Sequence, residues 1–234
     1  MKQLKKIPDK ALTREKKSTH PPTVLGPVDS LEDHVQPDWW RNIFNSLYLK
    51  TDADVVEDLN ITRKEVDLFS EILNLTTDDT ILDLCCGQGR HALEITRRGF
   101  KVEGLDRSRY LIQKAKASAK KENLNVKFRE GDARKLPFST DSFEVVMMLG
   151  NSFGYFETVQ DDLRALKEIF RALKPWGRLL LDVTDGEYLR EKFQARSWEW
   201  IDKKLFVCRE RSLSTNRQAN RGETEEGEAP ELND

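Results

Sequence analysis

The sequence predicts an α/β fold in which a doubly wound, mostly parallel sheet is flanked by helices. Short runs of β-branched and apolar residues alternate with segments whose apolar residues recur at helical spacing. A glycine-containing turn follows the first of these runs and leads straight into a helix. The expected strands are Thr80 to Leu84, Lys101 to Leu105, Val126 to Glu130, Phe143 to Met148 and Arg178 to Val183.

The ends of the intervening helices are predicted from capping residues. A Thr-x-x-Glu capping box at residues 62–65 predicts a helix that runs to about Leu75. Further helices are expected from Arg90 to Gly99, from Ser108 to about Glu122, and from Thr158 to Leu173 before Pro175 and Gly177. In a sheet wound in this way, ligands bind at the carboxyl ends of the strands.

Composition indicates one domain with a small-molecule partner. The chain has 234 residues, 34% charged and 38% hydrophobic, with a net charge of -2. This balance does not favour nucleic acid or an anionic membrane, and no run approaches the roughly 20 apolar residues of a spanning helix. The three cysteines, Cys85, Cys86 and Cys208, match neither a disulfide framework nor a zinc site, which favours a reduced, cytoplasmic protein without metal.

Both ends of the chain are expected to be disordered around a domain at residues 31–217. Residues 1–30 form a basic arm, for which a solvated tail is favoured over weak RNA binding or organelle targeting. Residues 218–234 are acidic and nearly devoid of large apolar groups.

The turn after the first strand has the features of a cofactor loop. Gly87 and Gly89 allow the backbone to approach a ligand closely, although this spacing also satisfies the dinucleotide fingerprint. Asp83, four residues before Gly87, suits an ammonium group and would repel a pyrophosphate. Asp106 ends the second strand, where a carboxylate can accept from both ribose hydroxyls. Asp132 ends the third strand, where its carboxylate can accept a hydrogen bond from the exocyclic amine of adenine.

These motifs resemble those of class I S-adenosylmethionine-dependent methyltransferases, a Rossmann-like family. Residues 81–91 are similar to the family's first motif, 102–108 to its acidic second motif and 131–138 to its third. Residues 173–177 occupy the place of its LKPGG turn, with Trp176 instead of the first glycine. The motifs and the resemblance assign cofactor contacts to Asp83, Cys85, Gly87, Gly89, Asp106, Arg107, Asp132, Ala133 and Leu149. For Arg107, stacking near the adenosine and a solvent-exposed position remain open alternatives.

The segment after the fourth strand, residues 148–156, is where the resemblance places the acceptor. It lacks the Asn/Asp-Pro-Pro-aromatic sequence of enzymes that methylate nucleobase amines or glutamine. Residues 149–153 instead resemble the matching stretch of glycine and sarcosine N-methyltransferases, which implies a small molecule, with an amine as one candidate. Asn151 and Tyr155 are therefore assigned to the substrate.

An aromatic stretch at residues 38–49 is typical of a lid over the cofactor in such enzymes. Tyr48 is predicted to form a hydrogen bond with the methyl donor or the methyl acceptor. For Trp40, Phe44 and Leu47, simple packing on the sheet at helical spacing is at least as good an explanation. No catalytic base is assigned: His91, in the first helical turn, is expected to be structural or to lie beside the cofactor.

The leading hypothesis is thus a methyltransferase acting on a small molecule. After the fifth strand little patterned sequence remains, and residues 206–209 read as one strand of an insertion. The alternative is therefore a methyltransferase-like binding or assembly module whose sheet is completed by another copy or a partner chain. A nicotinamide-dependent oxidoreductase is disfavoured by Asp83 and by the later motifs.

Overall fold

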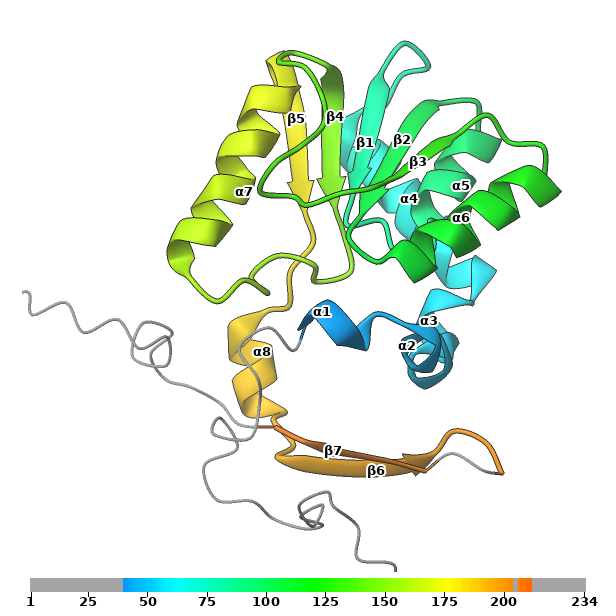
Figure 1. Cartoon of the computed structure of the whole chain (residues 1–234), viewed down its shortest axis with the longest axis vertical. Helices are drawn as coiled ribbons and strands as arrows, with labels where there is room; N and C mark the ends of the chain where they lie inside the picture. The colour runs from blue at the N-terminus through cyan, green and yellow to red at the C-terminus, as the bar shows by residue number, and fades with distance from the viewer. Residues whose placement is uncertain (1–39, 204–205, 212–234) are drawn as a thin grey trace, which may run out of the picture.

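The computed structural model describes residues 40–203 and 206–211, and it confirms the doubly wound parallel sheet. Five parallel strands lie in the order β3-β2-β1-β4-β5 (Figure 1). Their bounds are β1 Thr80–Leu84, β2 Lys101–Asp106, β3 Lys127–Glu130, β4 Phe143–Met148 and β5 Leu173–Leu181. The helices around and before them are α1 Trp40–Ile43, α2 Ser46–Thr51, α3 Ala53–Val56, α4 Leu59–Leu73, α5 Arg90–Arg97, α6 Arg109–Lys121 and α7 Val159–Ala172.

The apolar side chains of the strands supply two core layers, one on each face of the sheet. One layer packs α4, α5 and α6 against residues such as Ile81, Val145 and Met147. The other packs α7 against Leu82 and Val146. Figure 1 shows α7 on one face of the sheet and the other three helices on the opposite face. The central strands are covered on both sides, which is why their sequences are nearly continuous apolar runs.

Three predicted helix starts are confirmed by their caps. α5 follows Gly89, whose φ is 80°. The Ser108 hydroxyl accepts from the Leu111 amide at 3.2 Å at the start of α6, and the Thr158 hydroxyl accepts from the Asp161 amide at 3.1 Å at the start of α7. Such bonds satisfy amides that have no partner inside the helix.

The predicted capping box at residues 62–65 is wrong. α4 begins at Leu59, because Asp58 caps it by accepting from the Asn60 amide at 2.7 Å and the Ile61 amide at 3.3 Å. Thr62 lies inside the helix and donates its hydroxyl to the Asp58 carbonyl at 3.1 Å. Asp58, a stronger capping residue one turn upstream, thus sets the start of the helix. The Glu65 side chain is then available for contacts with other parts of the chain.

The fifth strand begins earlier than predicted. Residues 173–177, expected to form a turn before it, are its first part: Leu173 pairs with Phe143, and the register shifts before Val145. Trp176 in this segment has a φ of 66° and is 99% exposed. The residues expected to form a turn are part of the β4–β5 pairing, because a β-bulge accommodates the extra residues.

Beyond β5 the chain leaves the sheet. Helix α8 Gly186–Glu191 leads to an antiparallel pair, β6 Arg196–Trp200 and β7 Phe206–Glu210, so the strand predicted at residues 206–209 is confirmed. In the part of the chain that the structure describes, β5 pairs only with β4 and forms an edge. The tails predicted at residues 1–30 and 218–234 lie outside the described residues.

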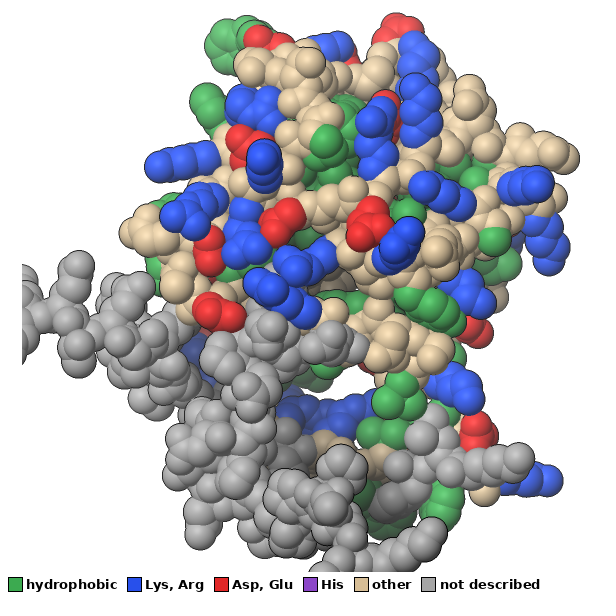
Figure 2. Space-filling view, in the orientation of Figure 1, with side chains coloured by type: hydrophobic (Ala, Val, Ile, Leu, Met, Phe, Trp, Pro, Cys, Tyr) green, Lys and Arg blue, Asp and Glu red, His purple; other side chains and the backbone are tan. Residues whose placement is uncertain are grey.

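Charged side chains of both signs lie on the face drawn in Figure 2, and the described helices include no membrane span. On the face drawn in Figure 2, basic and acidic side chains are interspersed over the helices and strands of the main domain. Within residues 40–203 and 206–211, the helices are too short or too polar to cross a bilayer.

Candidate functional site

A cavity of about 350 Å³ lies at the carboxyl ends of the strands. Helices α1, α2 and α3 lie across this end of the sheet (Figure 1). The walls of the cavity come from the ends of β1, β2 and β4, from the loops that follow them, and from the α1–α3 segment. The lining residues are Arg41, Phe44, Tyr48, Asp52, Cys85, Gly87, Asp106, Arg107, Ser108, Leu111, Ala133, Met148, Gly150, Asn151, Ser152, Phe153, Tyr155 and Phe156.

Asp106 is held in place by two backbone amides at the end of β2. Gly87 donates its amide to Oδ2 at 2.8 Å, and Ser108 donates its amide to Oδ1 at 2.7 Å. Burial raises the pKa of Asp106, and these two bonds oppose that rise. A carboxylate has about four lone-pair sites, so Asp106 retains acceptors for two ligand hydroxyls while it ties the glycine turn to β2.

The turn between β1 and α5 has an unusual backbone. Cys85, Gly87 and Gly89 have φ values of 61°, 55° and 80°. A Cβ at Gly87 would meet only Leu111, at 3.8 Å, which leaves its cavity side open to a ligand. A Cβ at Gly89 would lie 2.7 Å from the Phe128 ring. Gly89, which was assigned to the cofactor, thus permits packing under the turn and is not among the lining residues.

Asp83 and Asp132 bond to neighbouring groups and are not among the lining residues. Asp83 is 1% exposed and accepts from the Ala92 amide at 3.1 Å below the turn; burial raises its pKa to about 6. Asp132 accepts from Arg134 at 2.7 Å and from Arg107 at 3.3 Å. Burial would raise the pKa of Asp132, but hydrogen bonds from Arg134 hold it below its usual value.

The remaining predicted residues lie in or beside the cavity. Tyr48, Arg107, Ala133, Asn151 and Tyr155 line it. Asn151, with a φ of 57°, accepts from the Thr184 amide through Oδ1 at 3.0 Å, which ties the loop after β4 to the end of β5. Leu149, assigned to the cofactor, is buried in the core between the lining residues Met148 and Gly150.

His91 is part of a buried polar cluster that joins α4 to the start of α5. Its Nε2 lies 2.9 Å from Glu65 Oε2, and Arg90 donates to the same carboxylate. Burial opposes ionisation of Glu65, but the bonds from His91 and Arg90 lower its pKa to about 2. These contacts support the structural interpretation of His91. Burial also raises the pKa of the Cys85 thiol, which argues against a nucleophilic thiolate at the cavity.

The sequence predicted the aromatic stretch at residues 38–49 as a lid but did not single out Asp52, which lines the cavity from the same segment. The Phe44 ring lies 5.2 Å from that of Tyr48 and 5.6 Å from that of Tyr155, both edge to face. Phe44 therefore lines the cavity rather than packing on the sheet, and Leu47 is exposed. Ser108 donates its hydroxyl to the Phe44 carbonyl at 2.7 Å and so anchors this segment to β2. Asp52 carries no local signal, because only the fold of α1–α3 brings it to the cavity.

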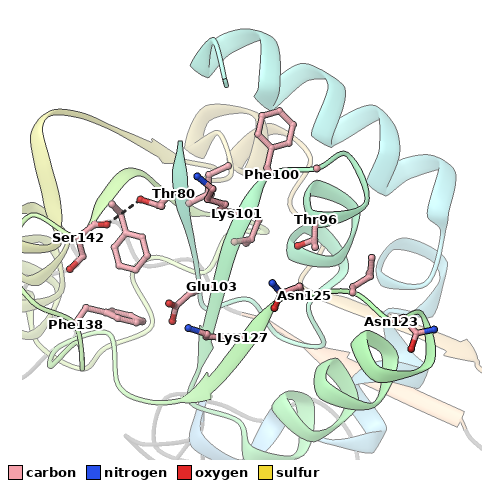
Figure 3. A pocket seen from close by; sticks show the side chains of 15 residues that line it. Thr80, Thr96, Phe100, Lys101, Glu103, Asn123, Asn125, Lys127, Phe138 and Ser142 are labelled. Atoms are coloured by element: carbon pink, nitrogen blue, oxygen red, sulfur yellow. Dashed lines mark hydrogen bonds between the residues drawn. The ribbon is translucent and has the colours of Figure 1, made fainter. Parts of the chain in front are cut away.

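A larger cavity, of about 660 Å³, lies at the opposite end of the sheet. Figure 3 shows its walls, with Lys101, Glu103 and Lys127 on β2 and β3 and Phe138 beside them. Thr80 donates its hydroxyl to the Ser142 carbonyl at 3.1 Å across this region. It is wide open and sits at the amino ends of the strands, away from the glycine turn.

Comparison with known proteins identifies a family for the central part of the chain. Residues 81–177, which run from β1 into β5, match the methyltransferase domain family. These residues are a methyltransferase domain. The chain is 38% identical over 149 residues to the demethylmenaquinone methyltransferase of Lactococcus lactis, covering 60% of the chain and 56% of that relative.

Two further comparisons extend this result. The cypemycin N-terminal methyltransferase of a Streptomyces species is 35% identical over 119 residues, which cover 50% of this chain and 47% of that protein. The crystal structure of the PH0226 protein from Pyrococcus horikoshii aligns with a TM-score of 0.50 and 32% identity over 56% of this chain and 58% of that one. The chain thus spans about half the length of the curated relatives it matches.

Proposed function

We propose that this chain binds S-adenosylmethionine in the carboxyl-end cavity and transfers its methyl group to a small-molecule acceptor. The observation that carries the proposal is Asp106, which lines the cavity and is held by the amides of Gly87 and Ser108. A rigid carboxylate beside an open glycine backbone is the arrangement that a ribose and a charged amino-acid tail require.

The residues present fit this cofactor. Asp106 would hold the ribose hydroxyls, the open side of Gly87 would face the amino-acid end, and Ala133 would lie against the adenine. Asp83 would act from below, because its bond to the Ala92 amide holds the glycine turn in shape. The volume of about 350 Å³ is within the range of cofactor pockets.

The protein's part in the reaction is alignment and exclusion of water. When bound, the cofactor supplies a methyl group already activated by the positive charge on sulfur, so the acceptor must be placed in line with it. The rings of Phe44, Tyr48 and Tyr155 line the cavity in edge-to-face contact, and their apolar faces would help to exclude water from it. Burial raises the pKa of Tyr48 to about 12, so its phenol orients a ligand as a neutral group and does not act as a base.

The acceptor is a small molecule, and we place nitrogen first among the acceptor atoms. The names of the relatives point to different acceptors, a menaquinone precursor in one and a peptide N-terminus in the other. Residues 149–153 resemble those of glycine and sarcosine N-methyltransferases, and the lining includes the carboxylate of Asp52. Both features favour a nitrogen acceptor over a quinone carbon.

We place this activity in the cytoplasm. Cys85, Cys86 and Cys208 are free thiols in the structure. Free cysteines, two of them adjacent, suit a reducing compartment.

Calorimetric titration with S-adenosylhomocysteine tests the cofactor site. Micromolar binding by the full chain and its loss in Asp106→Ala are expected, with NADH as a ligand control. Asp78→Ala, which removes an exposed carboxylate before β1, is the matched variant and should bind normally. A folded wild-type chain that binds NADH but not S-adenosylhomocysteine would overturn the proposal.

A second candidate is a binding module whose sheet is completed by a partner chain. The observation that favours it is the edge position of β5 among the described strands, with Leu179 and Val183 exposed on it and beyond it. Edge strands offer unpaired backbone groups to another chain. A monomer with methyl-transfer activity in light scattering and radiolabel assays would exclude this candidate, whereas an obligate assembly without turnover would favour it.

A further inference from the structure

The cavity brings together three aromatic rings and one carboxylate, from the α1–α3 segment and from the loop after β4. Phe44 contacts the rings of Tyr48 and Tyr155 at 5.2 and 5.6 Å, and Asp52 lines the same cavity. The Asp52 amide donates to the Tyr48 carbonyl at 3.1 Å, so the carboxylate follows Tyr48 by one helical turn. The helical spacing places both side chains on one side of the segment.

Asp52 is at a helix start, but its side chain does not cap the helix. It occupies the N-cap position of α3, yet its carboxylate makes no capping bond to that helix. The hydroxyl of Thr51 donates to Oδ2 at 2.7 Å. One neutral donor leaves several of the carboxylate's acceptor sites available to a ligand.

The charge of Asp52 reaches the polar ends of the aromatic cluster. Burial is the main cause that raises the pKa of both Tyr48 and Tyr155, and the negative charge of Asp52 is the second cause in each case. The nearby cations have partners of their own: Arg90 binds Glu65, and Arg107 lies 3.3 Å from Asp132. Arg41, which also lines the cavity, has contacts of its own as well.

We propose that Asp52 and the Phe44–Tyr48–Tyr155 rings recognise the cationic amino group of a small acceptor with an apolar body. Aromatic faces attract cations through their quadrupole, and a carboxylate adds a charge-assisted hydrogen bond. Asp52 is then a specificity-determining residue of the site, which selects amines against neutral molecules of the same shape. An ammonium nitrogen has no lone pair, so the bound group anchors the acceptor and can take a methyl only after it has released its proton to solvent. This inference rests on the proposed function, because it names the acceptor class of the same cavity.

The test measures binding of amines and their neutral isosteres to the full chain by calorimetry. The probes are 2-phenylethylamine against 2-phenylethanol, and hexylamine against 1-hexanol, each with and without saturating S-adenosylhomocysteine. The wild type should bind the amine about tenfold more tightly than the alcohol in at least one pair. Asp52→Asn, which keeps size and acceptor oxygen, should reduce that preference to less than about threefold.

Glu57→Gln is the matched control, because it removes one carboxylate at the end of α3 from a residue outside the cavity lining. It should preserve the amine preference. Thermal unfolding of both variants should match the wild type, which separates a recognition effect from misfolding.

Four results are decisive. Equal binding of amines and alcohols by the wild type, or an unchanged preference in Asp52→Asn, would overturn the inference. A loss of S-adenosylhomocysteine affinity in Asp52→Asn would also overturn it, since Asp52 would then serve the amino group of the cofactor. An Asp52-dependent amine preference in a chain that does not bind S-adenosylhomocysteine would support the inference and refute the proposed function alone.

Discussion

The two ends of the parallel sheet carry cavities of opposite character. The amino-end cavity is the larger, at about 660 Å³ against about 350 Å³, and some of its polar groups already have partners: Glu103 accepts from Arg129 at 3.1 Å, and Thr80 donates to the Ser142 carbonyl at 3.1 Å. At the carboxyl end, Asp106 is fixed by two amides and lines the smaller cavity. The polar groups that line the two cavities differ, and this difference separates a candidate site from a surface cavity better than volume does.

The difference follows from the direction of the chain. Helices α5 and α6 begin at the carboxyl end, after Gly89 and Ser108, and so direct their positive dipole ends toward that cavity. The same helices end near the other cavity, which receives carbonyl groups and negative dipole ends. We therefore expect a cofactor with hydroxyl and charged groups to find complementary partners at the carboxyl end.

The sharpest test of this comparison uses two acidic residues of the same strand. Asp106→Asn should weaken S-adenosylhomocysteine binding about 100-fold, or about 2.7 kcal/mol, because it removes a charged acceptor from a buried network. Glu103→Gln, at the amino-end cavity, should change the affinity less than about twofold. Calorimetry measures both, and equal losses in the two variants would refute the distinction between the ends.

Two glycines flank α5, and replacing each with alanine tests how tightly the chain packs at that end of the helix. Gly89→Ala should lower the free energy of unfolding by about 2 kcal/mol, because the new Cβ would clash with Phe128 at a positive φ. Gly99→Ala, where φ is 92° and the space is open, should cost about 1 kcal/mol. Urea unfolding measures both values. A smaller loss for Gly89→Ala than for Gly99→Ala would contradict the packing account.

The polar cluster behind the glycine turn predicts a pH-dependent stability. The pKa of Glu65 falls from 4.5 to about 2 on folding, so its ionised form stabilises the protein above pH 4.5 and this contribution is lost as the pH falls toward 2. Glu65→Gln should therefore be less stable than the wild type at pH 7, by a margin that shrinks in acid. Urea unfolding at pH 7 to 3 measures it, with the exposed Glu71→Gln as control. A margin that is constant with pH would refute the assigned coupling.

The smallest effect is expected at Trp176, where the resembling family carries glycine. Its φ of 66° is strained for a bulky residue, and its exposed side chain buries nothing in return. Trp176→Gly should raise stability by about 0.5 kcal/mol, since relief of strain exceeds the entropy that glycine adds to the unfolded chain. A lower melting temperature in calorimetric scans would show that Trp176 makes contacts that offset the strain.

Local patterns determined much of the fold. The bounds of β1 and β4 and the starts of α5, α6 and α7 were predicted correctly, because apolar runs and capping side chains act within a few residues. The start of α4 was predicted wrongly because Asp58 and Thr62 both offer a cap, and only the folded chain shows which one is used. The start of β5 depended on pairing with β4, which is likewise not local.

By itself the sequence determined the parallel α/β fold and the resemblance to methyltransferases, because apolar runs and glycine turns are encoded in short motifs. Only the tertiary structure decided what each acidic residue does. Asp106 faces the cavity, Asp83 and Asp132 bond to their neighbours, and Asp52 joins from a segment with no recognisable motif. The physical reason is that a carboxylate's role depends on the donors brought near it in space, and those donors come from distant parts of the chain.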